Sequence, residues 1–163
     1  MVILVMGTTG AGKSTVGELL SARLGWTFLD ADDFHPEANV QKMKHGIPLT
    51  DVDRMPWLER VHGELARLST EGKQVVLACS ALKQSYRDQL SAGLDFRVVY
   101  LRGTYEEMRR HIEARHGHFA GESILAGQFA DLEEPKDAVV LDVVRSPEVL
   151  ADDIIRRLDL SAS

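Results

Sequence analysis

Several features that would assign the chain to a special class are missing. The 163 residues include one cysteine, Cys79, so no internal disulfide can form, which fits a reducing compartment. No apolar run approaches the ~20 residues of a membrane span, and the apolar start at 1–6 is short for a signal peptide. The net charge of −6 argues against a broad nucleic-acid or anionic-membrane surface. We therefore expect a cytoplasmic protein that binds neither nucleic acid nor a membrane surface.

What is present is an alternation of strand and helix patterns without repeats or linkers. A chain of this length fits one domain with a hydrophobic core. Strands are predicted at 2–6, 27–29, 74–79, 96–101 and 138–142, and helices at 13–24, 57–71, from the third strand to about 91, 104–115 and 147–158. Residues 36–54 are predicted as turn-rich, and 116–136 as a loop with a short amphipathic piece. This order favours a parallel sheet wrapped by helices, an α/β fold.

The segment between the first strand and the first helix reads GTTGAGKS at 7–14. This is the G-x-x-x-x-G-K-[ST] phosphate loop in its strand–loop–helix context. Its glycines let backbone N–H groups point inward around an anion, and the helix N-terminus adds partial positive charge. We expect Lys13 to reach the β- and γ-phosphates of a nucleoside triphosphate and the Ser14 hydroxyl to ligate Mg²⁺.

Polar residues also follow the second and third strands. Asp30 and Asp32 follow one, and Ser80 and Lys83 the other. Ligands of open α/β sheets bind outside the carboxyl ends of the strands, so these residues are expected around one crevice. Asp30 suits Mg²⁺ through water, and Asp32 could orient an acceptor hydroxyl and take its proton. Solvated loop charge is the alternative for such residues.

A lid and an anion site are also predicted, on weaker patterns. Arg115, at a helix end beside Gly117, could swing over transferring phosphates, although arginine there often only complements the helix dipole. The candidates for holding an anionic substrate are Arg54, Lys83, Arg87 and His118. Each of these alone is more often a surface charge.

In its longer motifs the chain resembles the gluconokinases, P-loop sugar-acid kinases related to shikimate and nucleoside monophosphate kinases. The matching stretches are GTTGAGKST (7–15), DADDFHP (30–36) with Asn39, Lys42-Met43, GIPLTD (46–51) with Asp53-Arg54 and Pro56-Trp57-Leu58, CSALK (79–83), Tyr86-Arg-Asp88, Tyr100-Leu101, RHGHF (115–119), Gln128-Phe129 and LEEP (132–135). They cover nearly the whole chain in family order.

The resemblance implies ATP- and Mg²⁺-dependent phosphorylation of the 6-hydroxyl of D-gluconate, often by a homodimer. It implies a three-layer, nucleoside-monophosphate-kinase-like P-loop fold with a five-stranded parallel sheet. In this single domain the core comprises 1–34, 72–115 and 136–163, a substrate-binding helical insert about 35–71, and a lid about 116–135.

The resemblance also assigns residues to roles. Lys13 and Arg115 would stabilise the transferring phosphate, Asp30 with Ser14 the metal, and Asp32 the acceptor hydroxyl. The sugar-acid pocket would include Asp32, His35, Arg54, Ser80, Lys83, Arg87, His118 and Gln128. The nucleotide would meet Gly7, Thr8, Thr9, Gly10, Ala11, Gly12, Lys13, Ser14, Thr15, Arg110 and His111.

Four positions in three places depart from the family pattern. His111 stands where an arginine usually stacks on adenine, so ATP affinity could differ. Ala120-Gly121 replaces Met-Pro and Gly127 replaces Ser, which loosens the backbone of the predicted lid.

Two other functions fit the phosphate loop. One is a kinase for another small acceptor, such as shikimate or a nucleotide. The other is a GTP-dependent switch, but the N-K-x-D and D-x-x-G patterns of such switches are missing, since the one asparagine, Asn39, is followed by Val-Gln-Lys.

Overall fold

The computed structural model describes residues 1–117 and 122–161, in which five strands form one parallel sheet in the order β2-β3-β1-β4-β5. This confirms the predicted α/β fold. The strands are β1 (Val2–Met6), β2 (Thr27–Asp30), β3 (Val75–Ala78), β4 (Phe96–Arg102) and β5 (Val139–Asp142). The helices are α1 (Lys13–Leu24), η1 (Ala31–Phe34, a 3₁₀ turn), α2 (Glu37–Lys44), α3 (Asp51–Thr70), α4 (Gln84–Ser91), α5 (Tyr105–His116), α6 (Glu122–Asp131) and α7 (Pro147–Arg157).

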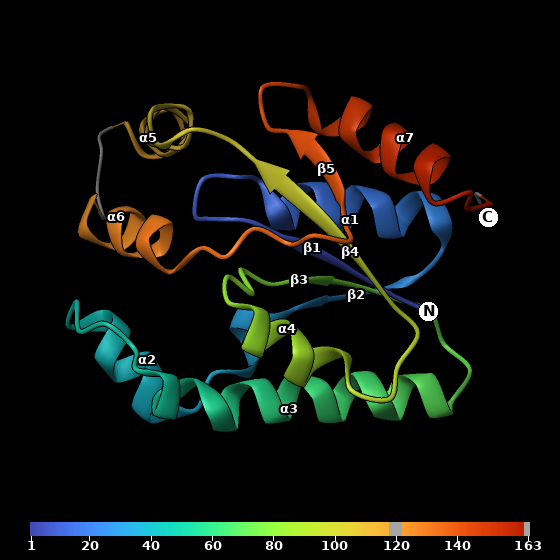
Figure 1. Cartoon of the computed structure of the whole chain (residues 1–163), viewed down its shortest axis with the longest axis horizontal. Helices are drawn as coiled ribbons and strands as arrows, with labels where there is room; N and C mark the ends of the chain where they lie inside the picture. Colours follow the sequence, from blue (N-terminus) through green and yellow to red (C-terminus); the bar gives the residue numbers. More distant parts are fainter. Residues whose placement is uncertain (118–121, 162–163) are drawn as a thin grey trace.

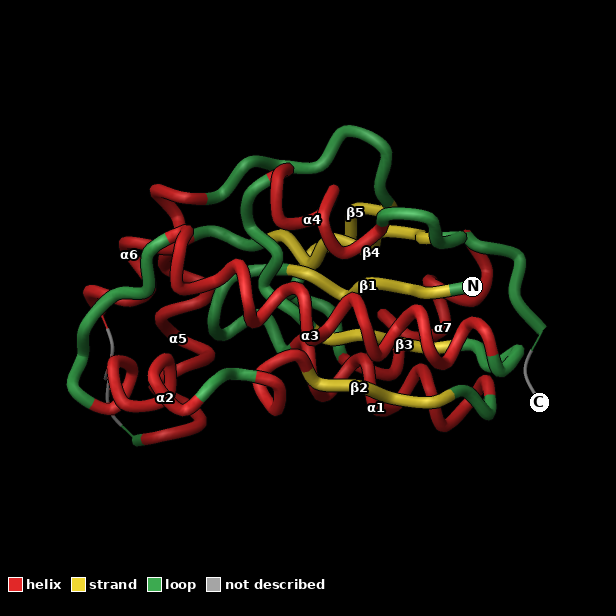
Figure 2. Tube along the Cα trace, turned by 90° about the horizontal axis from the view of Figure 1, so that it is seen from below, coloured by secondary structure: helices red, strands yellow, loops and turns green. Residues whose placement is uncertain are grey.

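Helices cover both faces of the sheet, with α3 and α4 on one side and α1, α5 and α7 on the other (Figures 1 and 2). The β1 strand is buried throughout, because its alternate side chains enter two different cores. Leu4 and Met6 pack in the core that holds Trp57 and Leu65 of α3. Ile3 and Val5 pack in the core that holds side chains of α1, α5, α6 and α7. The central strand therefore fixes the position of the loop that follows it.

The helix predicted at 57–71 begins six residues earlier, at Asp51, and part of the segment predicted as turns is helical as α2. Pro56 suggested a helix start, but it lies inside α3. The start is set instead by a capping box, in which the Thr50 hydroxyl accepts from the Asp53 amide and the Asp53 carboxylate accepts from the Thr50 amide. The Val52 carbonyl that Pro56 cannot bond belongs to an exposed residue, so water can satisfy it.

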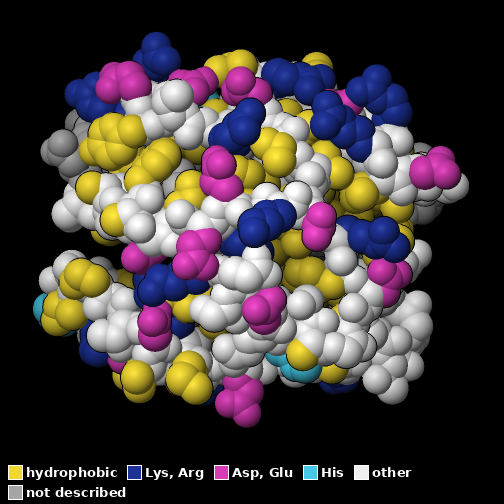
Figure 3. Space-filling model, in the orientation of Figure 1, with side chains coloured by type: hydrophobic (Ala, Val, Ile, Leu, Met, Phe, Trp, Pro, Cys, Tyr) yellow, Lys and Arg dark blue, Asp and Glu magenta, His cyan; other side chains and the backbone are white. Residues whose placement is uncertain are grey.

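Basic and acidic side chains are interspersed on the face shown in Figure 3, so neither sign dominates that face. Within 1–117 and 122–161, no helix combines the length and apolar character needed to cross a bilayer. The boundaries predicted for the insert and the lid remain predictions; α2 and α3 fall in the first segment and α6 in the second.

Candidate active site

The loop from Gly7 to Ser14 has the backbone shape that its glycines permit. Gly10 and Gly12 have φ of 88° and 85°, in the left-handed region that side chains disfavour. At Gly10 a Cβ atom would also lie 2.8 Å from the Met108 carbonyl oxygen of α5. Only glycine therefore lets the loop close against α5, and Gly12 ends it as the N-cap of α1, with Lys13 as the first helical residue.

The register of the sheet brings three strand ends to the same edge. Val5 of β1 and Asp30 of β2 both pair with Ala78 of β3. The space above these ends is a cavity of about 340 Å³. Its lining residues are Thr9, Gly10, Gly12, Lys13, Ser14, Thr15, Asp30, Asp32, Ala78, Cys79, Ser80, Arg115 and Gln128. Residues predicted from separate motifs thus share one site.

Ser14 and Asp30 are in direct contact. The Ser14 hydroxyl donates to Asp30 Oδ2 over 2.8 Å, and Asp30 Oδ1 accepts from the Asp32 amide over 3.0 Å. Both carboxylate oxygens are therefore held in place. A hydroxyl and a fixed carboxylate side by side form a hard-oxygen donor pair.

Asp32 and Lys13 carry opposite charge at the cavity, and each influences the other. Burial and the neighbouring Asp30 raise the pKa of the Asp32 carboxyl. Burial lowers the pKa of Lys13, against the attraction of Asp32. The ammonium of Lys13 donates to the Thr8 carbonyl over 3.1 Å. Because its anionic form is disfavoured, the Asp32 carboxylate accepts a proton more readily than an ordinary aspartate does.

Ser80 lines the cavity and Arg87 does not, so the pocket role of Arg87 stays a prediction. Arg87 is only 3% exposed, and its guanidinium donates to the carbonyls of Ala81, Leu82 and Glu133 over 2.8–3.0 Å. Ala81 has φ of 44°, a strained value for a residue with a side chain. Arg87 therefore stabilises the turn that presents Ser80 through its two terminal nitrogens, while its buried Nε has no hydrogen-bond partner among the described residues.

Two helices reach the phosphate loop from the side of the predicted lid. On α6, Gln128 Oε1 accepts from the Thr9 amide over 2.6 Å. On α5, His111 Nδ1 lies 2.9 Å from the Gly10 carbonyl oxygen, and Arg115 lines the cavity from the end of the helix. Arg110 is exposed and outside the cavity lining. His118 lies outside the described residues.

His35 lies between the cavity and α3. Its ring stacks on Trp57 at 4.1 Å between centroids, and Nε2 is 4.0 Å from Asp32 Oδ1. Trp57 itself donates to the Ala31 carbonyl over 2.6 Å, which fixes η1 against α3. Burial and the nearby Arg54 lower the pKa of His35, so its imidazole is neutral near pH 7.

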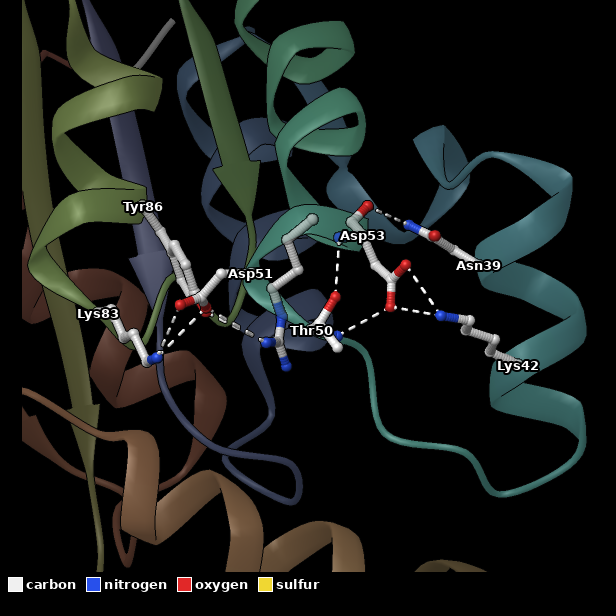
Figure 4. Close-up of polar contacts among 8 residues, drawn as sticks. Asn39, Lys42, Thr50, Asp51, Asp53, Lys83 and Tyr86 are labelled. Atoms are coloured by element: carbon white, nitrogen blue, oxygen red, sulfur yellow. Dashed lines mark hydrogen bonds and ion pairs between the residues drawn. The ribbon is translucent and has the colours of Figure 1, made fainter.

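Arg54 and Lys83 belong to a polar cluster beyond the cavity lining, together with Asp51 and Tyr86 (Figure 4). Asp51 and Tyr86 were in the matching motifs, but no role was predicted for either residue. The contacts join residues 32 and 35 positions apart, on α3 and at the start of α4. No local spacing indicates such a contact. The Thr50–Asp53 capping pattern was the available signal that α3 begins beside Asp51.

The substitution Arg87→Lys tests the internal role of this arginine. Lysine cannot reproduce the fork of donors, so we expect the free energy of unfolding to fall by about 2–4 kcal/mol. That corresponds to a melting temperature roughly 5–15 °C lower. Thermal denaturation measures it, with Arg97→Lys as the control because Arg97 is half-exposed and, in the part of the chain that the structure describes, forms its ion pair with Asp95. A variant as stable as the parent that has lost acceptor binding would instead place Arg87 in the pocket.

Comparisons with known proteins agree on one family. A family model described as an AAA domain matches residues 2–135. A probable gluconokinase of Rattus norvegicus is 46% identical over 82% of this chain and 83% of its own. A gluconokinase of Gluconobacter oxydans is 42% identical over 94% of this chain and 89% of its own. The crystal structure of a gluconokinase from Sinorhizobium meliloti has a TM-score of 0.89 at 38% identity, over 97% of this chain and 91% of the other. With the phosphate loop, the paired aspartates and this likeness over most of its length, the chain belongs to the gluconokinase family.

Proposed function

We propose that this protein transfers the γ-phosphoryl group of ATP, with Mg²⁺, to the 6-hydroxyl of D-gluconate. The observation that carries the proposal is the convergence of Lys13, Ser14, Asp30 and Asp32 on one cavity in a chain of the gluconokinase family. The phosphate loop supports a triphosphate donor, and the family supports a sugar-acid acceptor. Asp32 supplies the group that a hydroxyl acceptor needs.

The residues present fit a magnesium ion. Ser14 and Asp30 offer adjacent hard oxygens beside the phosphate loop. Among residues 1–117 and 122–161 no group of three or more His, Cys, Asp or Glu side chains could hold a metal. That suits Mg²⁺, which takes one or two protein ligands and completes its shell with water and phosphate oxygens. When bound, the ion would neutralise charge on the β- and γ-phosphates.

The protein groups act on the two ends of the transfer. The 6-hydroxyl oxygen forms a bond to the γ-phosphorus while the bond from that phosphorus to the β,γ-bridging oxygen breaks. Asp32 receives the hydroxyl proton, and the electron pair of the broken bond leaves with ADP. Lys13 and Arg115 hold the charge on the transferring group through their donors, and backbone N–H groups of the loop hold the phosphates before it.

A panel of acceptors tests the substrate. With ATP and Mg²⁺ we expect kcat/KM for D-gluconate to exceed that for shikimate or any nucleoside monophosphate by at least about 100-fold. The physical reason is that a site built for a polyol acid leaves its polar groups unpaired with the wrong acceptor. A coupled assay of ADP release measures it, and phosphorus NMR locates the phosphate on the product. Equal rates with shikimate or a nucleotide would refute the choice of acceptor.

The substitution Asp32→Asn separates catalysis from stability. The raised pKa of Asp32 means that its ionised form is disfavoured in the folded state. Its contribution to the free energy of unfolding is present below the unfolded pKa and is lost as pH rises through the folded value. At pH 7, Asp32→Asn should therefore raise the melting temperature slightly while kcat falls by about 100-fold or more.

Differential scanning calorimetry and initial rates check the two effects together. Asp33→Asn is the control, because Asp33 is adjacent in sequence but outside the cavity lining, and its turnover should stay near that of the parent. Nearly normal kcat in Asp32→Asn would remove this residue from the role of base.

A further inference from the structure

The carboxylate of Asp51 is the centre of the polar cluster between α3 and α4. It accepts from the Tyr86 hydroxyl and from Lys83 Nζ, the latter over 3.2 Å, and Arg54 Nη1 lies 3.9 Å away (Figure 4). Arg54 also donates to the Tyr86 hydroxyl oxygen over 3.1 Å. Two cations and a phenol thus surround one carboxylate, which is the donor set that a bound carboxylate ligand requires.

The donor side chains of this cluster are more buried than the side chain of the acceptor, Asp51. The Tyr86 ring is buried, with Arg54 Cζ and Lys83 Nζ 5.5 and 5.7 Å from its centroid. The side chains of Arg54 and Lys83 are 22% and 28% exposed, and that of Asp51 is 62% exposed. Moving the Asp51 carboxylate out of the cluster therefore costs less free energy than moving any of the donor side chains.

Asp51 is also unnecessary for starting its own helix. The N-terminus of α3 is capped by Thr50 and Asp53, and Asp53 is further held by Lys42 over 2.8 Å. The two aspartates of this turn thus face different groups: Asp53 stabilises the backbone, and Asp51 contacts α4. Rotation of the Asp51 side chain would leave the capping box intact.

The cluster is connected to Asp32 at the cavity through His35 and α3. The His35 ring stacks on Trp57, which follows Arg54 by three residues on α3, and His35 Nε2 is 4.0 Å from Asp32 Oδ1. A path of neighbouring side chains therefore runs from the proposed base to the cationic cluster. An acceptor with a hydroxyl at one end and a carboxylate at the other matches the chemistry of the two ends of this path.

We propose that Asp51 occupies, in the ligand-free protein, the position that the carboxylate of the acceptor takes on binding. This inference rests on the proposed function, because it assumes a sugar-acid acceptor. Asp51 is then an internal competitor and a determinant of specificity. An anionic acceptor replaces it on Arg54, Tyr86 and Lys83, while a neutral sugar offers these donors nothing in exchange and leaves Asp51 in place.

Removing the competitor should strengthen acceptor binding. In the ligand-free protein, the form with Asp51 on the cationic side chains would dominate. The observed affinity is then the intrinsic affinity multiplied by the fraction of protein in which Asp51 has left them. We expect Asp51→Asn to lower the dissociation constant for D-gluconate by about fivefold, a size typical of releasing exposed ion pairs. Titration calorimetry without nucleotide measures it, and KM should fall in parallel with little change in kcat.

A charge control separates replacement from simple repulsion. The hydrogen bond to Asp51 is the main cause of the raised pKa of Lys83, and the charge of Asp131, on α6, adds to it, so Asp131→Asn removes a negative charge from the same neighbourhood. That variant should change the dissociation constant by less than about twofold. Asp51→Ser serves as a second variant should the asparagine form fold poorly, and is expected to bind as tightly as Asp51→Asn.

The outcomes are distinct. Unchanged or weaker gluconate binding in both Asp51 variants would refute the inference, as would an equal gain in Asp131→Asn. In either case the parent protein would still bind and phosphorylate gluconate. If the parent protein itself neither binds nor phosphorylates gluconate, the proposed function fails, and the inference fails with it.

Discussion

The hydrogen bond between the Ser14 hydroxyl and Asp30 is the contact on which the site depends. It joins the phosphate loop to the end of β2, while the second oxygen of Asp30 holds the backbone of Asp32. The groups that would handle the donor and the acceptor are thereby fixed relative to each other. The parallel register of β1, β3 and β2 makes this contact possible, because it aligns Val5, Ala78 and Asp30.

Around this contact the fold supplies rigidity on one side and adaptable groups on the other. Lys13 and Ser14 follow β1, which is buried between two cores, and Asp30 is the last residue of β2. Arg115 and Gln128 come from α5 and α6, and Arg54 and Lys83 from the edges of α3 and α4. The strained turn at Ala81 is stabilised by the buried Arg87, and this turn holds Ser80 on the rigid side of the site. Such an arrangement suits a kinase, whose phosphate site must stay fixed while the acceptor enters and leaves.

The sequence predicted the parts of the structure that depend on local rules. The helix at 13–24 has the predicted bounds, because Gly12 and Gly25 are left-handed caps at its two ends. The burial of β1 followed from its unbroken apolar run. Three features needed no tertiary information: the phosphate loop, the succession of strands and helices along the chain, and the placement of Asp30 and Asp32 at strand ends. The predicted start of α3 was wrong, because the helix begins at the capping box of Thr50 and Asp53 inside the segment predicted as turn-rich.

What the sequence could not predict depends on contacts between distant residues. An arginine in a polar helix looks like a surface or ligand charge until the carbonyls around it are known, as with Arg87. The roles of Asp51 and Tyr86 likewise depend on how α3 meets α4.

In the proposed reaction, one triphosphate and one sugar acid meet between the Ser14–Asp30 pair and Asp32. A crystal structure with Mg²⁺, a non-hydrolysable ATP analogue and D-gluconate tests it most directly. We predict the metal beside Ser14 and Asp30, and the 6-hydroxyl within about 3 Å of Asp32; the two aspartates turned away from both ligands would contradict the account.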